Sequence, residues 1–240
     1  MPVEEIYSNA KEDLNNENYE SAIKLYETLQ SRYPYGRYAQ QALLEMAYAY
    51  HRNDEAEMAI STAEQFIKQY PNNPYVDYAY YVKGLANFRG EISTINSLSG
   101  QDQTERDPKA AQDSFAAFKD LVTRFPDSKY APDSRLRMQY LINALARYEL
   151  HVAGYYLRRG AHIAAANRAQ GVLTQYPNSP ATLDALEIMV QAYDAMGMID
   201  LRDDARRVLE KNSVATATPA DEETPVGGGK SGKSWWQFWK

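Results

Sequence analysis

The amino-acid sequence predicts an all-α fold made of about five stacked helical pairs. An aromatic residue directly followed by proline occurs four times, at Tyr33-Pro34, Tyr70-Pro71, Phe125-Pro126 and Tyr176-Pro177. Each aromatic-proline pair closes a run with the 3.6-residue periodicity of an amphipathic helix. The prolines are 37, 55 and 51 residues apart. A motif that recurs at this spacing is typical of stacked helical repeats, which bind other polypeptides far more often than they catalyse reactions.

The first interval is close to the tetratricopeptide period of about 34 residues. Apolar positions in the first unit form one helical stripe, and small residues recur where two helices of a tetratricopeptide hairpin touch. These small residues are Ala10, Ala22, Ala47, Ala59, Gly84 and Ala165. The sequence therefore predicts a tetratricopeptide-repeat superhelix, with added segments in the two longer intervals.

The first two helical pairs follow each other without interruption. Residues 3–34 form the first pair, with a turn at 15–18, and residues 38–71 form the second, with a turn near 52–54. The third pair is expected to begin at Asn73-Pro74, because asparagine can cap a helix and proline suits its first position.

The third pair is interrupted over residues 90–107, where the sequence is polar and rich in turn residues. A helix is expected to restart at Asp107-Pro108. Residues 133–159 hold one helix about twice the usual length, and residues 161–176 pair with it. The fifth pair comprises 180–196 and 200–211, joined at Gly197.

The chain divides into three parts by this pattern. Residues 1–131 hold repeats one to three with the 90–107 insertion, and residues 132–212 hold repeats four and five. From 213 to 240 the composition shifts to Gly, Ser, Thr and Pro, so we expect a disordered linker. Its end, Trp235-Trp-Gln-Phe-Trp-Lys240, contains all three tryptophans of the chain. A membrane interface and another protein surface are both plausible partners for this tail.

Composition excludes several classes of function. The net charge is −6 without a basic block, so nucleic acid is not an expected partner. There is no cysteine, which excludes disulfides, thiolate zinc sites and cysteine nucleophiles. No apolar run is long enough to span a membrane. Met1-Pro2-Val3 leads directly into a helix, so we expect no signal peptide in this chain.

No catalytic constellation is found. Residues 227–234 fit the phosphate-loop pattern literally, but no strand precedes them and only six residues follow. His51, His151 and His162 have no partner at ligand spacing, and no serine lies in a nucleophile elbow. We therefore expect no enzyme activity, no cofactor and no metal site.

Two groups of residues are candidates for binding. The first helices of pairs one to three should line a concave groove, which places Tyr48, Tyr50, Asp77, Tyr78 and Tyr81 where they could contact an extended peptide. The alternative is that these tyrosines only pack helices together.

The second group contains Arg158, Arg159 and Arg168, close to Asn167 in the fourth pair. Guanidinium groups bind carboxylates efficiently, so these arginines could contact a partner protein. Pairing within the chain is the alternative.

The sequence also resembles the BamD family, tetratricopeptide lipoproteins of the outer-membrane β-barrel assembly machinery. The resemblance covers roughly residues 3–212 and includes the insertion. It is carried by several short segments: Ile6-Tyr7 with Ala10, Arg32-Tyr-Pro-Tyr-Gly36, Tyr48-Ala-Tyr50, Asp77-Tyr78, Arg106-Asp-Pro108, Tyr155-Tyr156, Arg159-Gly-Ala161 and Ala166-Asn-Arg168.

The resemblance implies a non-enzymatic scaffold on the periplasmic face of the outer membrane. Its amino-terminal repeats would recognise signals of unfolded outer-membrane proteins, and the groove tyrosines are the candidates for this role. Its carboxy-terminal repeats would bind the polypeptide-transport-associated domains of the barrel-forming subunit, with Arg159 and Arg168 as candidate contacts. A companion assembly lipoprotein would be a further partner. The family's lipid anchor would lie outside this chain.

The closest rival is another cell-envelope tetratricopeptide scaffold, such as the periplasmic coordinator of the Tol–Pal system. Those proteins also contain Tyr-Pro pairs, but they usually carry an amino-terminal coiled coil and more regular repeats. The insertion at 90–107 and the double-length helix favour the barrel-assembly family.

Overall fold

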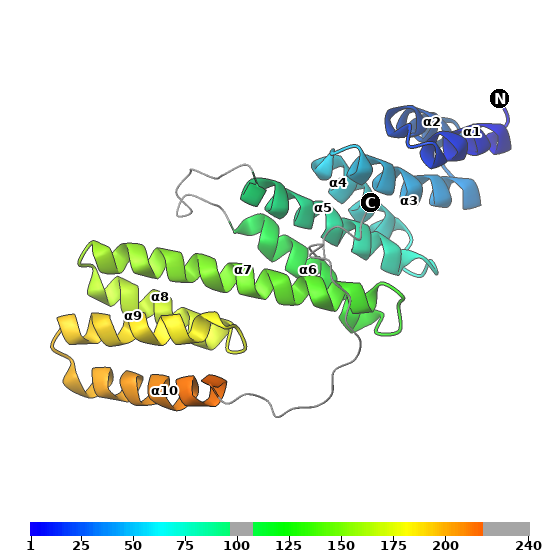
Figure 1. Cartoon of the computed structure of the whole chain (residues 1–240). Helices are drawn as coiled ribbons and strands as arrows, with labels where there is room; N and C mark the ends of the chain where they lie inside the picture. The colour runs from blue at the N-terminus through cyan, green and yellow to red at the C-terminus, as the bar shows by residue number, and fades with distance from the viewer. Residues whose placement is uncertain (97–107, 218–240) are drawn as a thin grey trace, which may run out of the picture.

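The computed structural model describes residues 1–96 and 108–217, and these residues form ten α-helices and no strand. Consecutive helices pack as antiparallel hairpins, and the hairpins stack along the array from α1 and α2 at one end to α10 at the other (Figure 1). This arrangement confirms the predicted tetratricopeptide superhelix of five helical pairs. The helices are α1 Val3–Asn15, α2 Tyr19–Arg32, α3 Arg37–Arg52, α4 Ala56–Gln69, α5 Val76–Asn96, α6 Lys109–Arg124, α7 Ala131–Arg158, α8 His162–Gln175, α9 Ala181–Ala195 and α10 Ile199–Ala217.

Each aromatic-proline pair ends the second helix of a hairpin, as predicted. The four aromatic residues adopt almost the same backbone conformation, with φ between −129° and −134° and ψ between 51° and 67°. Proline disfavours the helical conformation in the residue before it, which explains why the helix stops there. Each aromatic N–H still bonds to the carbonyl four residues earlier, for example Tyr33 to Leu29 at 2.8 Å. The four second helices therefore end in the same way, although the first turn then continues differently, through Gly36 with a φ of 93°.

The predicted small residues lie where helices touch. Ala10, Ala22, Ala47, Ala59 and Ala165 are completely buried. At Gly84 a Cβ atom would lie only 2.5 Å from Cε1 of Phe118, so α5 and α6 approach each other more closely than an alanine would allow. Close packing of this kind is what holds the two helices of each hairpin together.

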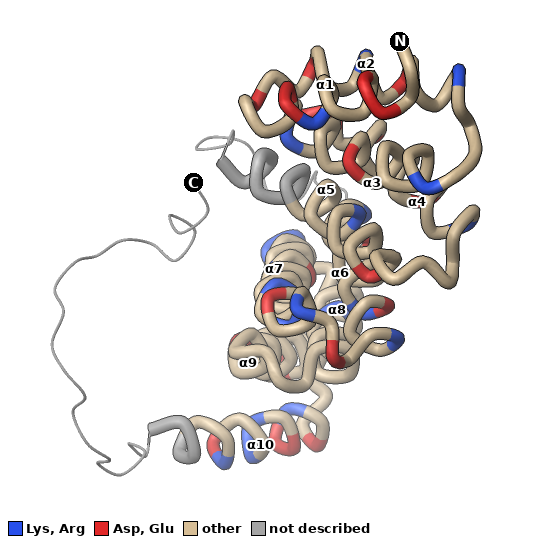
Figure 2. Tube along the Cα trace, turned by 90° about the vertical axis from the view of Figure 1, so that its right-hand side faces the viewer, with Lys and Arg blue, Asp and Glu red and all other residues tan. Residues whose placement is uncertain are grey.

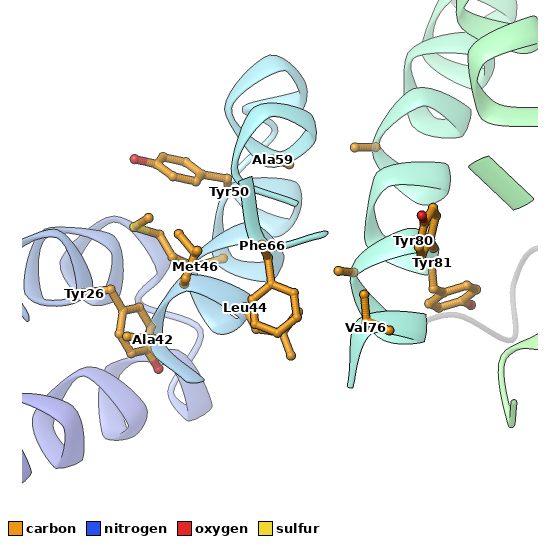
Figure 3. Close-up of a cluster of buried hydrophobic side chains, with 14 of the residues drawn as sticks. Tyr26, Ala42, Leu44, Met46, Tyr50, Ala59, Phe66, Val76, Tyr80 and Tyr81 are labelled. Carbon is orange, nitrogen blue, oxygen red and sulfur yellow. The ribbon is translucent and has the colours of Figure 1, made fainter. Parts of the chain in front are cut away.

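The core runs through the array as large side chains between these small contacts. Tyr26, Phe66 and Phe118 are the largest fully buried side chains. Figure 3 shows part of this cluster, with buried side chains contributed by α2, α3, α4 and α5. The amino-terminal hairpins therefore share one continuous core.

Some predicted helix boundaries were wrong. Helix α5 continues through Gly90 to Asn96, because one glycine costs a helix only about 1 kcal/mol. Helix α10 continues beyond 211 to Ala217. Prolines 74, 108 and 180 precede the helices that they were expected to begin, and the Asn73 side chain instead accepts a hydrogen bond from the Tyr75 N–H. The remaining insertion, 97–107, and the tail, 218–240 with its phosphate-loop-like stretch, lie outside the described residues.

The long helix of the fourth pair was predicted correctly. Helix α7 has 28 residues, against 13 in α1 and 16 in α3. It packs against α6, α8 and α9 and so connects the third pair with the last two (Figure 1). No helix in the described ranges is long and apolar enough to cross a membrane.

Candidate functional site

A groove runs along the first helices of the amino-terminal pairs. Its first part, a hollow of about 850 Å³, lies between α1 and α3 and is lined by Tyr7, Arg37 and Tyr38 among others. Its second part, about 550 Å³, continues to α5 and to the start of α7. The two hollows share Lys11, Asn15 and Gln41, so they form one continuous surface. We call this surface the amino-terminal groove.

The floor of the groove is organised around the carboxylate of Glu45 on α3. The Tyr26 hydroxyl donates a hydrogen bond to Glu45 Oε2 at 2.6 Å, and the Lys11 ammonium and the Tyr7 hydroxyl donate to Oε1 at 2.6 and 3.2 Å. The Glu45 side chain is only 10% exposed. A buried carboxylate is costly unless it is paired and hydrogen-bonded, and here donors from α1 and α2 satisfy it. Burial first, and then the charge of Glu45 and the hydrogen bond to it, raise the pKa of both Tyr7 and Tyr26 well above the ordinary value.

One wall of the second hollow is aromatic. The ring of Tyr78 lies 6.5 Å from Tyr48 and 5.2 Å from Tyr130, centroid to centroid, and Tyr130 stacks on Tyr81 at 4.7 Å. Among the described residues, the Tyr78 hydroxyl has no side-chain hydrogen-bond partner. This wall therefore offers an apolar surface and a free hydroxyl to an occupant of the groove.

Charged side chains border the aromatic wall. Arg52 donates a hydrogen bond to the Tyr48 hydroxyl at 2.8 Å, stacks on the ring of Tyr19 and lies 3.7 Å from a carboxylate oxygen of Glu17. Lys129 lies 5.0 Å above the ring of Tyr130. These cations could bind carboxylates or main-chain carbonyls of a peptide.

The structure brings only part of the predicted peptide-binding set to the groove. Tyr48 and Tyr78 line the second hollow. Tyr50 is 4% exposed and donates a hydrogen bond to Glu27 of α2 at 2.8 Å; in Figure 3 it lies toward the opposite end of α3 from Tyr26.

Tyr81 and Asp77 are not among the residues that line the two hollows. Tyr81 is 7% exposed and donates a hydrogen bond to Asp133 at 2.8 Å. Asp77 accepts hydrogen bonds from the Ser128 hydroxyl at 2.6 Å and from the Tyr78 N–H at 2.8 Å. Tyr81 stacks on Tyr130 and Asp77 bonds to the main chain of Tyr78, so both contact residues of the aromatic wall.

Sequence reasoning missed Tyr38, Tyr75 and Tyr130, which all line the groove. A signal for them exists in the sequence. Each follows the proline of an aromatic-proline pair by four residues, as Tyr38 follows Pro34. In the first three repeats this position lies at the start of the next first helix: Tyr75 and Tyr130 directly precede α5 and α7, and Tyr38 is the second residue of α3. The full motif is therefore aromatic-Pro-x-x-x-Tyr in the first three repeats.

The predicted arginines lie in different surroundings. Arg168 on α8 forms an ion pair with Glu149 on α7, Nη1 to Oε2 at 3.0 Å, and lines a hollow of about 370 Å³ with Tyr156 and Asn167. Arg159 stacks on Tyr155 at 5.4 Å.

Arg158 ends α7 and is exposed, and neither it nor Arg159 lines the hollow of Arg168. The pairing of Arg168 within the chain does not exclude a partner, because almost half of its side chain remains exposed. A guanidinium group has five donors and can bind a second carboxylate.

No group of three or more histidine, aspartate or glutamate side chains in the described parts of the chain is arranged to hold a metal ion. The arrangement of the groove is thus one of hydrogen-bond donors, aromatic rings and paired charges. Aromatic rings beside hydrogen-bond donors are typical of surfaces that recognise extended peptides.

The chain is similar in sequence to known proteins over most of its length. The model of the YfiO family, described as outer membrane lipoprotein, matches residues 1–208. A Neisseria meningitidis protein named outer membrane protein assembly factor BamD is 43% identical over 237 residues, which cover 99% of this chain and 87% of the relative. A Vibrio cholerae protein of the same name is 36% identical over 212 residues, 88% of each chain. A third, from Xylella fastidiosa, is 38% identical over 213 residues, 89% of this chain and 73% of the relative.

Proposed function

The chain belongs to the YfiO family of outer membrane lipoproteins, and we propose that it is a non-enzymatic scaffold for the assembly of outer-membrane proteins. The Neisseria meningitidis relative, named as an assembly factor, aligns with 99% of this chain and so over both the amino-terminal groove and Arg168. Their names favour this role over that of a Tol–Pal coordinator. On this proposal the protein works at the periplasmic face of the outer membrane, held by a lipid anchor outside the present sequence.

The amino-terminal groove would bind signal segments of unfolded outer-membrane proteins. The observation that carries this proposal is the continuous groove in which Tyr48, Tyr78 and Tyr130 form an aromatic wall beside Lys129 and Arg52. Strands of outer-membrane barrels alternate apolar and polar side chains. An extended strand could place its apolar side chains on the wall while its polar atoms bond to the Tyr78 hydroxyl and the flanking cations.

The carboxy-terminal half would bind the polypeptide-transport-associated domains of the barrel-forming subunit, and a companion lipoprotein would bind elsewhere on the array. Arg168 is the main candidate for the first contact, because it is half-exposed and held in place by Glu149. Arg158 and Arg159 are weaker candidates at the end of α7. An acidic group on the partner would share Arg168 with Glu149.

A binding measurement on the purified chain tests the role of the groove. The probe is a fluorescent peptide with the carboxy-terminal strand sequence of an outer-membrane barrel, and the readout is fluorescence anisotropy. We expect Tyr78→Ala to weaken binding about tenfold, since one buried aromatic contact contributes about 1.5 kcal/mol or more. Ile163→Ala, at a side chain 66% exposed on α8, is the matched control. Equal affinity in both variants would contradict the proposal.

A further inference from the structure

The last helical pair ends the array with an apolar surface that no later helix of the described chain covers. In every earlier repeat the second helix packs against the first helix of the next pair: α2 on α3, α4 on α5, α6 on α7 and α8 on α9. Helix α10 packs on α9, and Figure 2 shows it at the end of the array, opposite α1 and α2. Within residues 1–96 and 108–217, no helix takes the position that an eleventh helix would have.

Apolar side chains on α10 and on the turn before it remain partly exposed. Met198, Leu201, Ala205 and Val208 follow the 3-4-3 spacing of a helix-packing seam. Ala205 is buried against α9, but Met198, Leu201 and Val208 are 44%, 47% and 46% exposed. We call these three side chains the α10 stripe. Ile199 is also 49% exposed but lies outside this spacing. The regular spacing of the other three indicates a missing partner rather than scattered surface residues.

The chain itself carries an apolar segment that can supply the partner. All three tryptophans lie in the last six residues, and Trp235, Trp236, Phe238 and Trp239 are spaced as one face of a helical turn. The seventeen residues between α10 and this segment, 218–234, include Val226 as their only large aliphatic side chain and no aromatic residue. The apolar content of the tail is therefore concentrated at its end.

The length of the connecting segment matches the distance to the α10 stripe. Leu201 lies sixteen residues before Ala217, which is about 24 Å along a helix that rises 1.5 Å per residue. A linker of seventeen residues has a root-mean-square span of roughly 20–25 Å. When the span matches the distance between two sites, the effective concentration of the tethered segment is near its maximum, in the millimolar range.

We propose that the tryptophan-rich segment 235–240 docks in the same chain on the α10 stripe and caps the open end of the repeat array. The indole rings would cover Leu201 and Val208. Docking would bury apolar area both of the tail and of the α10 stripe. Terminal repeats of solenoids need a cap that separates the core from water, and the tail would provide it.

Intrinsic tryptophan fluorescence tests this proposal directly, because every tryptophan of the chain is in the segment. In the full-length protein we expect emission at shorter wavelength than in denaturant, and protection from acrylamide quenching. Leu201→Gln or Val208→Gln should each lower the ratio of docked to undocked tail about tenfold, as loss of one aliphatic contact implies. Both residues are about half-exposed, so the variants should keep the circular dichroism of the parent.

Leu136→Gln is the matched control, because Leu136 is 73% exposed on α7, away from the α10 stripe. It should leave the emission unchanged. The proposal is overturned if the emission of the full-length protein equals that in denaturant, or if the two α10 variants behave like the control. A blue shift that depends on protein concentration would mean docking on a second copy and would also overturn it. So would a blue shift that occurs only when vesicles of phosphatidylethanolamine and phosphatidylglycerol are added.

Discussion

Replacing Gly84 by alanine should destabilise the third helical pair, although alanine is the better helix former. A Cβ at position 84 would lie 2.5, 2.7 and 2.8 Å from three ring atoms of Phe118. That ring is fully buried and also contacts Tyr81 and Phe88, so it cannot simply move away. Separating α5 from α6 would stretch the hydrogen bond from the Ser114 hydroxyl to the Gly84 carbonyl, now 2.9 Å.

The expected magnitude follows from two opposing terms. Overpacking a close-packed core costs about 1–3 kcal/mol, and a clash this short with a rigid ring belongs at the upper end. Alanine gains about 1 kcal/mol over glycine in helix propensity. We therefore expect Gly84→Ala to lower the free energy of unfolding by about 1–2 kcal/mol, measured by urea denaturation with circular dichroism at 25 °C.

Two further variants separate the effect of the clash from the effect of helix propensity. Gly171→Ala, on α8, would place its Cβ 3.9 Å from the nearest atom, the flexible end of Gln175, so it should stabilise the protein by up to about 1 kcal/mol. In a Phe118→Leu background, Gly84→Ala should cost clearly less than in the parent, because the ring atoms that it meets are gone. If Gly84→Ala stabilises the protein as Gly171→Ala does, the close approach of α5 and α6 is refuted.

Three other predictions concern the floor of the groove, the arginine site and one turn. Tyr26→Phe should cost about 1–3 kcal/mol, because the buried Glu45 carboxylate loses its shortest hydroxyl donor. The pKa of Tyr26 is raised in the folded protein, so its contribution to the free energy of unfolding is complete below pH 10, the pKa in the unfolded chain, and falls as the pH rises further. In urea denaturation from pH 8 to 11, the free energy of unfolding of Tyr26→Phe should therefore fall less steeply than that of the parent. Arg168→Glu should abolish pull-down of the barrel-forming subunit. Arg147→Glu, at an exposed position on α7, should not. If Arg168→Glu recovers as much barrel-forming subunit as the parent, Arg168 is not part of the interface. Gly197→Ala should cost about 1 kcal/mol in a thermal melt, since Gly197 has a φ of 68° and open space around it, and an unchanged melting temperature would contradict the strain argument.

The repeat architecture could be predicted because its signals are local. A proline fixes the conformation of the residue before it, so the four aromatic-proline pairs mark four helix ends wherever the helices lie in space. Small residues at a fixed register likewise show which helix faces touch. The breaks at residues 90 and 211 were placed too early because polar composition alone does not end a helix.

The candidate site could be predicted only in part. Tyr48 and Tyr50 cannot share a helix face, because two residues correspond to about 200° of rotation, so the sequence already contained the reason to exclude Tyr50. The supporting bonds could not be read from the sequence. Glu45 collects donors 34 and 19 residues away in Lys11 and Tyr26, and Arg168 meets Glu149 across 19 residues. Such contacts depend on how the hairpins stack.

Photocrosslinking in cells that make outer-membrane proteins tests the central claim most directly. A photoreactive residue is placed at positions 48 and 78 in the amino-terminal groove, at 159 and 168 in the carboxy-terminal half, and at the exposed control position 163. The proposal predicts crosslinks from 48 and 78 to unfolded outer-membrane proteins, and from 168, with or without 159, to the barrel-forming subunit. Crosslinks to unfolded outer-membrane proteins that are as strong from 163 as from 48 and 78 would contradict it.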